Sequence, residues 1–255
     1  MMHPDIALPR LIAHRGLSAR APENTLSAVR AAHQAGCTWV ELDVQLLGDG
    51  TPVIWHDATV KRCSDGRERL VDLSLPQARR LDAGSWFSDA FRGERLATLG
   101  EMLALVDALD LGLNLELKVN RGRSPAALVE EVVPAALDAL PPDRVIVSSF
   151  HPDALACARD LASASRLALG VLFEGLPGDW RAQCEAVEAF SVHVDWRWLG
   201  KSGAQAVREA GYPLLCYTPN DPTAFAHQWE WGVTSVISDD PPRFAGHLPP
   251  EPARA

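Results

Sequence analysis

The feature that most constrains the fold of this chain is a strict alternation of short β-rich segments with helix-like segments. Eight β-rich segments span residues 10–14, 38–44, 111–118, 144–150, 166–173, 190–196, 213–218 and 234–239. Several of the helix-like segments between them begin at Pro or Asp and end at Gly, as helices commonly do. This alternation indicates βαβ units, and eight units in ~250 residues match a (β/α)8 TIM barrel. A doubly wound parallel sheet is the alternative fold.

One further β-rich segment does not fit the parallel ring. Residues 51–57 (TPVIWHD) follow the strand-like residues 41–47 after a short Gly-Asp-Gly turn, and such a turn between two strands predicts an antiparallel hairpin. Pairing outward from the turn places His56 roughly opposite Asp43. The next region, about residues 57–98, is rich in charges and breaks the strand-helix rhythm. We therefore expect it to be a small insertion that caps the barrel.

The composition is that of one globular domain. The 255 residues are 47% apolar, so we expect a single barrel domain over residues 1–255, with the insertion and a Pro-rich tail at about 246–255. The 24 Lys and Arg residues against 33 Asp and Glu give a net charge of -9. This charge argues against a nucleic-acid surface, which needs a basic stripe to neutralise phosphates. An anionic substrate would require local positive charge.

The N-terminus and the cysteines bear on location. Residues 1–10 lack a basic region followed by an apolar core, and no apolar run reaches the ~18 residues that span a bilayer. The five cysteines are odd in number and lack metal-type spacing, which suits free thiols in a reducing compartment. We expect a cytoplasmic protein without stable membrane insertion. The sequence does not indicate an oligomeric state.

Residues that can carry chemistry gather at the ends of the first three predicted strands and of the hairpin. They are His14, Arg15, Glu41, Asp43, His56, Glu116 and Lys118. Barrel enzymes place their chemistry at the C-terminal ends of the strands, and side chains two apart on a strand share a face. Each carboxylate pair, taken alone, is equally consistent with a polar strand end or a salt bridge. Their common position at one end of the barrel favours a site.

Three converging carboxylates need a compensating positive charge, because like charges at close range cannot all stay ionised. Glu41, Asp43 and Glu116 would therefore bind one divalent cation, and an all-oxygen ligand set favours Mg²⁺ or Ca²⁺ over zinc. An imidazole titrates near neutral pH, so His14 and His56 suit general acid-base catalysis.

Arg15 and Lys118 add a planar fork and a point charge, which together suit a phosphate group. The remaining histidines considered, His33, His151, His193, His227 and His247, are interpreted as helix, loop or tail residues without function.

The loop after the first strand should aim its polar residues. His14 and Arg15 are adjacent and would face opposite ways on a regular strand, so both reach one site only if the chain bends at Arg15 and Gly16, where glycine permits the turn. In the following PENT segment, Asn24 or Thr25 can cap the next helix, and we favour Asn24. Such a cap would also fix the loop.

Eight short motifs, in order, resemble the glycerophosphodiester phosphodiesterase family. They are AHRG, APENT, ELDVQ, DGTPVIWHD, LNLELK, VSSF, CYTPND and VISDDP, within about residues 11–242. One tetrapeptide alone would be unspecific, whereas the joint pattern is highly specific. The resemblance implies a (β/α)8 barrel with a small insertion. It also implies hydrolysis of glycerophosphodiesters, such as glycerophosphocholine or glycerophosphoethanolamine, to an alcohol and sn-glycerol 3-phosphate.

The resemblance further implies roles for single residues. His14 and His56 would be the acid-base pair, Glu41, Asp43 and Glu116 the ligands of one divalent ion, and Arg15 and Lys118 the phosphate contacts. The chain departs from the family pattern in YTPN, where Tyr217 replaces a Trp that resembles a wall of the glycerol pocket. This departure concerns the fit of the substrate more than the chemistry.

Two other functions are alternatives. A lysophospholipase D-like lipid phosphodiesterase would use an apolar rim, for which Trp86, Phe87 and Phe91 in the insertion are candidates, although packing of the insertion is the simpler role for these rings. A non-catalytic phosphate-binding barrel is compatible with the fold. It would have little use for an acid-base pair beside a metal.

Overall fold

Eight parallel strands form a closed ring in the computed structural model, which describes residues 2–120 and 122–249. They are β1 Leu11–His14, β2 Trp39–Leu46, β4 Gly112–Leu117, β5 Val145–Ser149, β6 Ala168–Phe173, β7 Ser191–Asp195, β8 Leu214–Tyr217 and β9 Ser235–Ser238. The ring closes because β1 pairs in parallel with both β2 and β9. The predicted TIM barrel is confirmed, and the doubly wound sheet is wrong because its open sheet would have two edges, whereas the parallel strands here close into a ring through β1.

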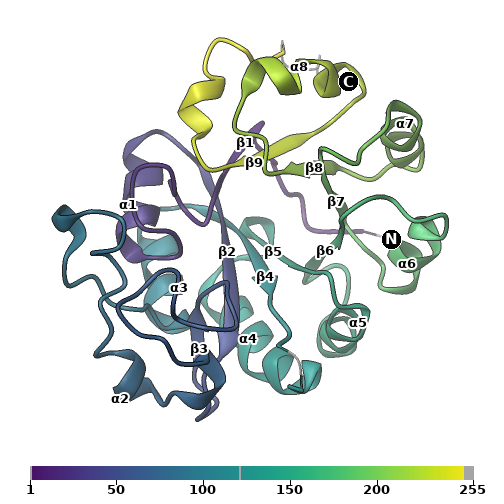
Figure 1. Cartoon of the computed structure of the whole chain (residues 1–255). Helices are drawn as coiled ribbons and strands as arrows, with labels where there is room; N and C mark the ends of the chain where they lie inside the picture. Colours follow the sequence, from purple (N-terminus) through teal and green to yellow (C-terminus); the bar gives the residue numbers. More distant parts are fainter. Residues whose placement is uncertain (1, 121, 250–255) are drawn as a thin grey trace.

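Helices lie outside the ring, between consecutive strands (Figure 1). They are α1 Leu26–Gln34, α3 Leu99–Ala108, α4 Pro125–Ala139, α5 Pro152–Leu161, α6 Trp180–Ala186, α7 Lys201–Glu209 and α8 Pro222–Glu230, and a 3-10 helix, η4 Pro241–Phe244, follows β9. Local chemistry sets several of their starts. Thr98 and Glu101 form a capping box at α3, Asp221 caps α8, and Pro occupies the first turn of α4, α5 and α8. None of the described helices has the length and apolarity to cross a membrane.

The apolar core has two layers, which explains why β2 is buried along its whole length. Val40, Leu42 and Val44 belong to the large cluster between strands and helices. Trp39, on the opposite face, belongs to a smaller cluster with Ile12, Ile146, Ala168, Leu215 and Ile237. A Cβ at Gly112 would lie 2.0 Å from the Trp39 ring, so glycine is required there. Trp39 thus fills the barrel on the face that also carries Glu41 and Asp43.

The predicted hairpin is present. β3, Pro52–Ile54, pairs antiparallel with β2, with Val44 opposite Ile54. The amide of Trp55 donates to the carbonyl of Asp43 at 2.9 Å, so Trp55 lies opposite Asp43. The predicted pairing of His56 with Asp43 was therefore wrong by one residue, because the turn is centred on Asp49. His56 follows the end of β3 and reaches the barrel mouth from there.

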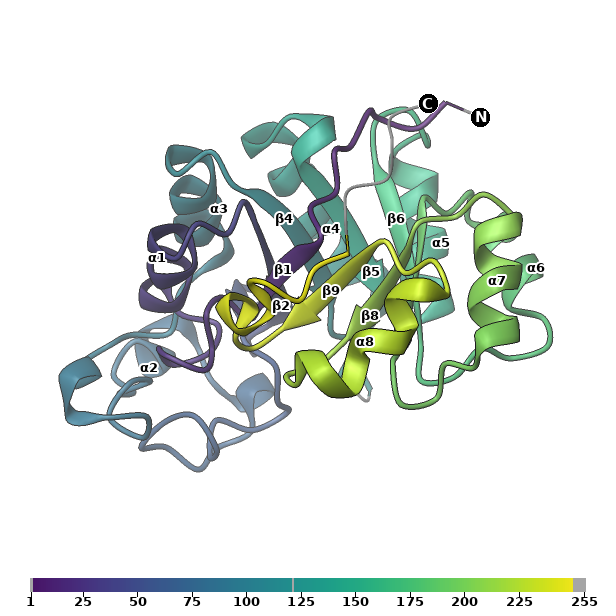
Figure 2. The same ribbon diagram turned by 90° about the horizontal axis from the view of Figure 1, so that it is seen from above.

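The region after β3 has few regular elements before α3: 3-10 helices η1 Leu70–Asp72 and η2 Asp89–Phe91, and the single-turn helix α2 Leu75–Ala78. It has a small apolar core of its own, which includes Val60, Leu70 and Leu96. Figures 1 and 2 show it beside the ring, on the side of α1 and α3. We interpret it as the insertion expected at about 57–98. Residues 250–255 of the expected Pro-rich tail lie outside the described residues.

Candidate active site

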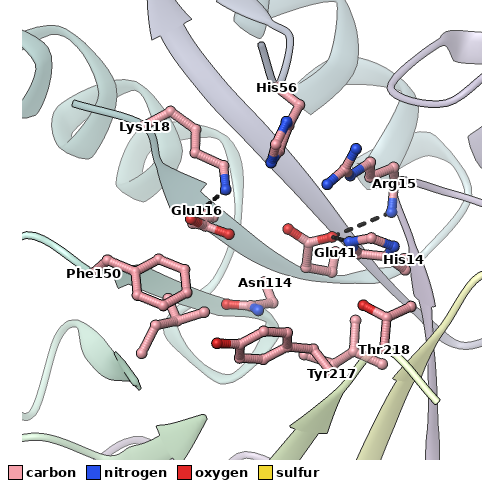
Figure 3. A pocket seen from close by; sticks show the side chains of 12 residues that line it. His14, Arg15, Glu41, His56, Asn114, Glu116, Lys118, Phe150, Tyr217 and Thr218 are labelled. Atoms are coloured by element: carbon pink, nitrogen blue, oxygen red, sulfur yellow. Dashed lines mark hydrogen bonds and ion pairs between the residues drawn. The ribbon is translucent and has the colours of Figure 1, made fainter. Parts of the chain in front are cut away.

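Most of the residues singled out from the sequence line one pocket of about 200 Å³ at the C-terminal ends of the strands. Its lining comprises His14, Arg15, Glu41, His56, Asn114, Glu116, Lys118, Phe150, Leu172, Tyr217, Thr218 and Ile237. Asp43 is the predicted site residue outside this lining, because it is only 1% exposed; its carboxylate contacts Lys118 and Arg15, which do line the pocket. In Figure 3, Lys118, His56 and Arg15 lie on one side of Glu41 and Glu116, and Phe150 and Tyr217 on the other.

The three predicted carboxylates converge. Oxygen atoms of Glu41, Asp43 and Glu116 lie within 4.8 Å of one another, and all three side chains are buried. Burial, together with the charge of Asp43, raises the pKa of Glu41 well above its usual range, and burial raises the pKa of Glu116 to about 7. Burial would raise the pKa of Asp43 as well, but Lys118 and Arg15 hold it below its usual range. The site thus has more negative charge than its own lysine and arginine neutralise.

These carboxylates fit a divalent cation. Among the described residues, Glu41 Oε1 is buried with neither a hydrogen bond nor an ion pair, while Asp43 Oδ1 and Glu116 Oε1 are contacted only by the single ammonium of Lys118. A buried oxygen without a partner is costly, and one ammonium shared by two carboxylates leaves the third uncompensated, so a divalent cation would satisfy the cluster better. The donor set consists only of oxygen, which suits a hard ion.

Two cations contact these carboxylates from the side. Lys118 Nζ lies 3.1 Å from Asp43 Oδ1 and 2.5 Å from Glu116 Oε1. Arg15 Nε lies 3.2 Å from Asp43 Oδ2, and its Nη1 donates to Glu23 Oε1 at 2.7 Å. Burial would lower the pKa of both cations, but the carboxylates, Asp43 foremost, raise it. Both side chains therefore stay charged at the pocket wall.

The bend expected after β1 is confirmed. Arg15 has a φ of 55° and Gly16 a φ of 78°, so two consecutive residues adopt the left-handed conformation. A Cβ at Gly16 would lie 2.6 Å from the backbone of Ala28, so glycine also lets the loop pack against α1. The Arg15 amide donates to Glu41 Oε2 at 3.2 Å. This turn is what allows adjacent His14 and Arg15 to line the same pocket.

The expectation for Asn24 was wrong. Thr25 is the N-cap of α1, and its side chain accepts from the amide of Ala28. Asn24, with a φ of 59°, instead donates from Nδ2 to Asp43 Oδ2 at 2.8 Å, and its Oδ1 accepts from the Asp43 amide at 3.2 Å. An amide side chain can donate and accept together, which a buried carboxylate beside its own backbone N–H requires. Asn24 is therefore a support of the carboxylate cluster.

Each predicted catalytic histidine has a carboxylate partner. His14 Nδ1 lies 2.6 Å from Asp239 Oδ1, and Asp239 also accepts from Ser18 and Asn220. His56 Nδ1 lies 2.7 Å from Asp57 Oδ1. Burial lowers the pKa of His56, while Asp43 opposes the change. With Nδ1 engaged, Nε2 is the nitrogen that remains for a substrate on either ring.

Sequence reasoning missed both histidine partners. Asp57 directly follows His56, and Asp239 directly follows β9, so position at the end of a β-rich segment was a usable signal. It also missed Asn114, which lies two residues before Glu116 on the same face of β4 and lines the pocket. The far wall is apolar, and Tyr217 forms part of it beside Phe150, with ring centroids 5.9 Å apart. The Tyr217 hydroxyl donates to the Phe173 carbonyl at 2.8 Å, away from the carboxylates.

The chain is similar in sequence and fold to known phosphodiesterases. The sequence model of the glycerophosphoryl diester phosphodiesterase family matches residues 14–243. A glycerophosphodiester phosphodiesterase of Caldanaerobacter subterraneus is 33% identical over 232 residues, which are 91% of this chain and 94% of that protein. Another from Bacillus subtilis is 26% identical, over 96% of this chain and 87% of that protein.

Among solved structures, a phosphodiesterase of Oleispira antarctica superposes with a TM-score of 0.90 at 34% identity, covering 94% of this chain and 96% of that one. That structure was solved in complex with its product, sn-glycerol-3-phosphate.

Proposed function

The chain belongs to the glycerophosphoryl diester phosphodiesterase family, and on that premise we propose that it hydrolyses glycerophosphodiesters to an alcohol and sn-glycerol 3-phosphate. One observation carries the proposal: a cluster of three buried carboxylates and two carboxylate-paired histidines share one pocket with Arg15 and Lys118. The product bound by the Oleispira antarctica relative supports the same substrate class.

Glu41, Asp43 and Glu116 would hold one Mg²⁺ or Ca²⁺, which when bound supplies Lewis-acid polarisation of a phosphate oxygen. Arg15 and Lys118 stabilise the remaining negative charge of the diester, the main obstacle to nucleophilic attack on it. Both cations line the pocket beside the carboxylates that would hold the ion.

His14 and His56 move the protons. One imidazole accepts a proton at Nε2 from the nucleophile, which is water or the glycerol 2-hydroxyl, and the other donates a proton from Nε2 to the leaving alkoxide. Attack by the 2-hydroxyl would give a cyclic phosphate, which water must then open, with the same two imidazoles moving the protons, to yield sn-glycerol 3-phosphate. Asp239 and Asp57 hold the Nδ1 atoms and thereby fix both rings. The two histidines are similarly arranged, and either division of the acid and base roles is compatible with the geometry.

The lipid-directed alternative gains no support from the insertion. Trp86 and Phe91 each pack edge-on against Phe87, and the Trp86 indole donates to the Ala83 carbonyl at 2.9 Å. Trp86 is 38% exposed, while the two phenylalanines are half-buried. The rings mainly pack against one another, and we propose a small-molecule substrate in the cytoplasm, in keeping with five free thiols.

The test is release of sn-glycerol 3-phosphate from glycerophosphocholine, glycerophosphoethanolamine and glycerophosphoglycerol. We expect turnover that EDTA abolishes and that excess Mg²⁺ or Ca²⁺ restores. Lysophosphatidylcholine serves as the lipid comparison, and a higher kcat/KM for it would favour the lipid-directed alternative. No release from any of these diesters with either ion would leave the phosphate-binding barrel as the better description.

A further inference from the structure

Arg62, in the segment after β3, lies between two acidic side chains that each contact a residue of the proposed site. Its Nε donates to Asp57 Oδ2 at 2.7 Å, and its Nη2 to Asp57 Oδ1 at 3.0 Å. Its Nη1 donates to Glu23 Oε2 at 2.6 Å, and Nη2 also donates to Glu23 Oε1 at 2.8 Å. All three guanidinium nitrogens are used, in two bidentate contacts. This is the geometry for which Arg is better suited than Lys.

Each of the two acidic residues also contacts a residue of the proposed site. Asp57 contacts Nδ1 of His56, and Glu23 contacts Arg15, which in turn contacts Asp43. These contacts form one continuous series of charged groups. It runs from the Asp43 carboxylate, through Arg15 and Arg62, to the His56 imidazole. Asp57 and Glu23 are far apart in the sequence, and Arg62 is the residue that joins them.

We propose that Arg62 is a positioning residue that aligns the His56 imidazole and the Arg15 guanidinium with each other across the pocket. It does so from outside the pocket and does not touch the substrate. Without it, Asp57 and Glu23 each keep their inner partner but lose the charge that fixes their carboxylate planes. The His56 ring and the Arg15 fork would then sample more orientations, and correct alignment is what proton transfer requires.

The location of Arg62 gives the segment after β3 a role in catalysis. The same segment also contacts α1 directly, since Ser27 Oγ donates to Glu94 Oε2 at 2.5 Å. Arg62 of the same segment contacts both Glu23 in the loop after β1 and Asp57 at the end of the hairpin. The inference rests on the proposed acid-base role of His56, and its test separates the two.

The decisive variant is Arg62→Ala. The matched control is Arg92→Ala, because Arg92 lies in the same segment and also forms an ion pair, with Asp89. We expect Arg62→Ala to lower kcat about 10- to 100-fold, the usual cost of losing a group that orients a catalytic residue, with KM changed much less. Arg62→Lys should be nearly as slow, because one ammonium cannot make both bidentate contacts. Arg92→Ala should keep the parent kcat.

Chemical rescue distinguishes alignment from folding. Guanidinium chloride at millimolar, non-denaturing concentration should restore part of the kcat of Arg62→Ala and leave the Arg92→Ala and parent enzymes unchanged. Unchanged kcat in Arg62→Ala, full activity in Arg62→Lys, or a loss confined to KM would each overturn the proposal. A loss of kcat that guanidinium does not relieve would do so too, since it would indicate disruption of the fold. If His56→Ala turned over normally, the proposed acid-base role of His56 would fail instead, whatever Arg62→Ala did.

Discussion

His193 should make the stability of this protein depend on pH below about 6.5. The ring lies on β7 and is fully buried, with one nitrogen, Nε2, 2.8 Å from Ser191 Oγ, while Nδ1 has no partner among the described residues. Burial lowers its pKa from 6.5 to about 3. The sequence interpretation grouped His193 with helix, loop and tail histidines, and this placement was wrong.

The sign follows from which state binds the proton. Between pH 6.5 and pH 3 the unfolded chain is protonated at His193 and the folded chain is not, so the stabilising contribution is complete above pH 6.5 and is lost as the pH falls toward 3. Each pH unit in that window changes the free energy of unfolding by ~1.4 kcal/mol. Between pH 7.5 and pH 5.0 the expected loss is about 2 kcal/mol.

Urea unfolding of the parent and of His193→Asn at these two pH values measures the effect. The parent should lose about 2 kcal/mol more than the variant between pH 7.5 and pH 5.0, because the other titrating groups are common to both proteins and cancel. His33→Asn, at an exposed position on α1, should behave as the parent. Equal losses in the parent and in His193→Asn would refute the reasoning.

Three further predictions concern the site and the loop before α1. His14→Ala and His56→Ala should each lower kcat at least ~10²-fold in steady-state assays, and near-normal turnover in both would exclude the acid-base scheme. Asn24→Ala should weaken activation by Mg²⁺ or Ca²⁺ about 10- to 100-fold in a metal titration, since it removes both contacts with Asp43; an unchanged titration would contradict the supporting role. Gly16→Ala should cost more than ~2 kcal/mol in denaturant unfolding, from its positive φ and from the clash with α1. Gly100→Ala in α3, where a Cβ meets open space, should instead be neutral or stabilising, and equal effects at the two glycines would argue against this account.

The barrel was predictable because strand-helix alternation is a local property that the sequence displays directly. The pocket followed from one topological rule, that parallel strands bring their C-terminal ends to one face. The bend at Arg15 and Gly16 was predictable for a similar reason, since two adjacent residues cannot both reach one site from a straight strand.

What the sequence did not reveal depends on contacts between distant segments. Asn24 satisfies the local rule for a helix cap, and only the position of Asp43 shows that its amide is used elsewhere. The four hydrogen bonds of Arg62 join Glu23 to Asp57, and no local pattern connects these two residues. The hairpin register was wrong by one residue because the turn alone does not determine which residues pair.

The two-sided burial of β2 links correct folding to metal binding. Trp39, Glu41 and Asp43 share the inner face, and Val40, Leu42 and Val44 share the outer one. A slip of one residue in the pairing of β2 would exchange these sets and turn Glu41 and Asp43, two of the proposed metal ligands, toward the helices. Retention on a chelate column charged with the activating cation should therefore separate correctly registered molecules from misfolded ones in a single preparation.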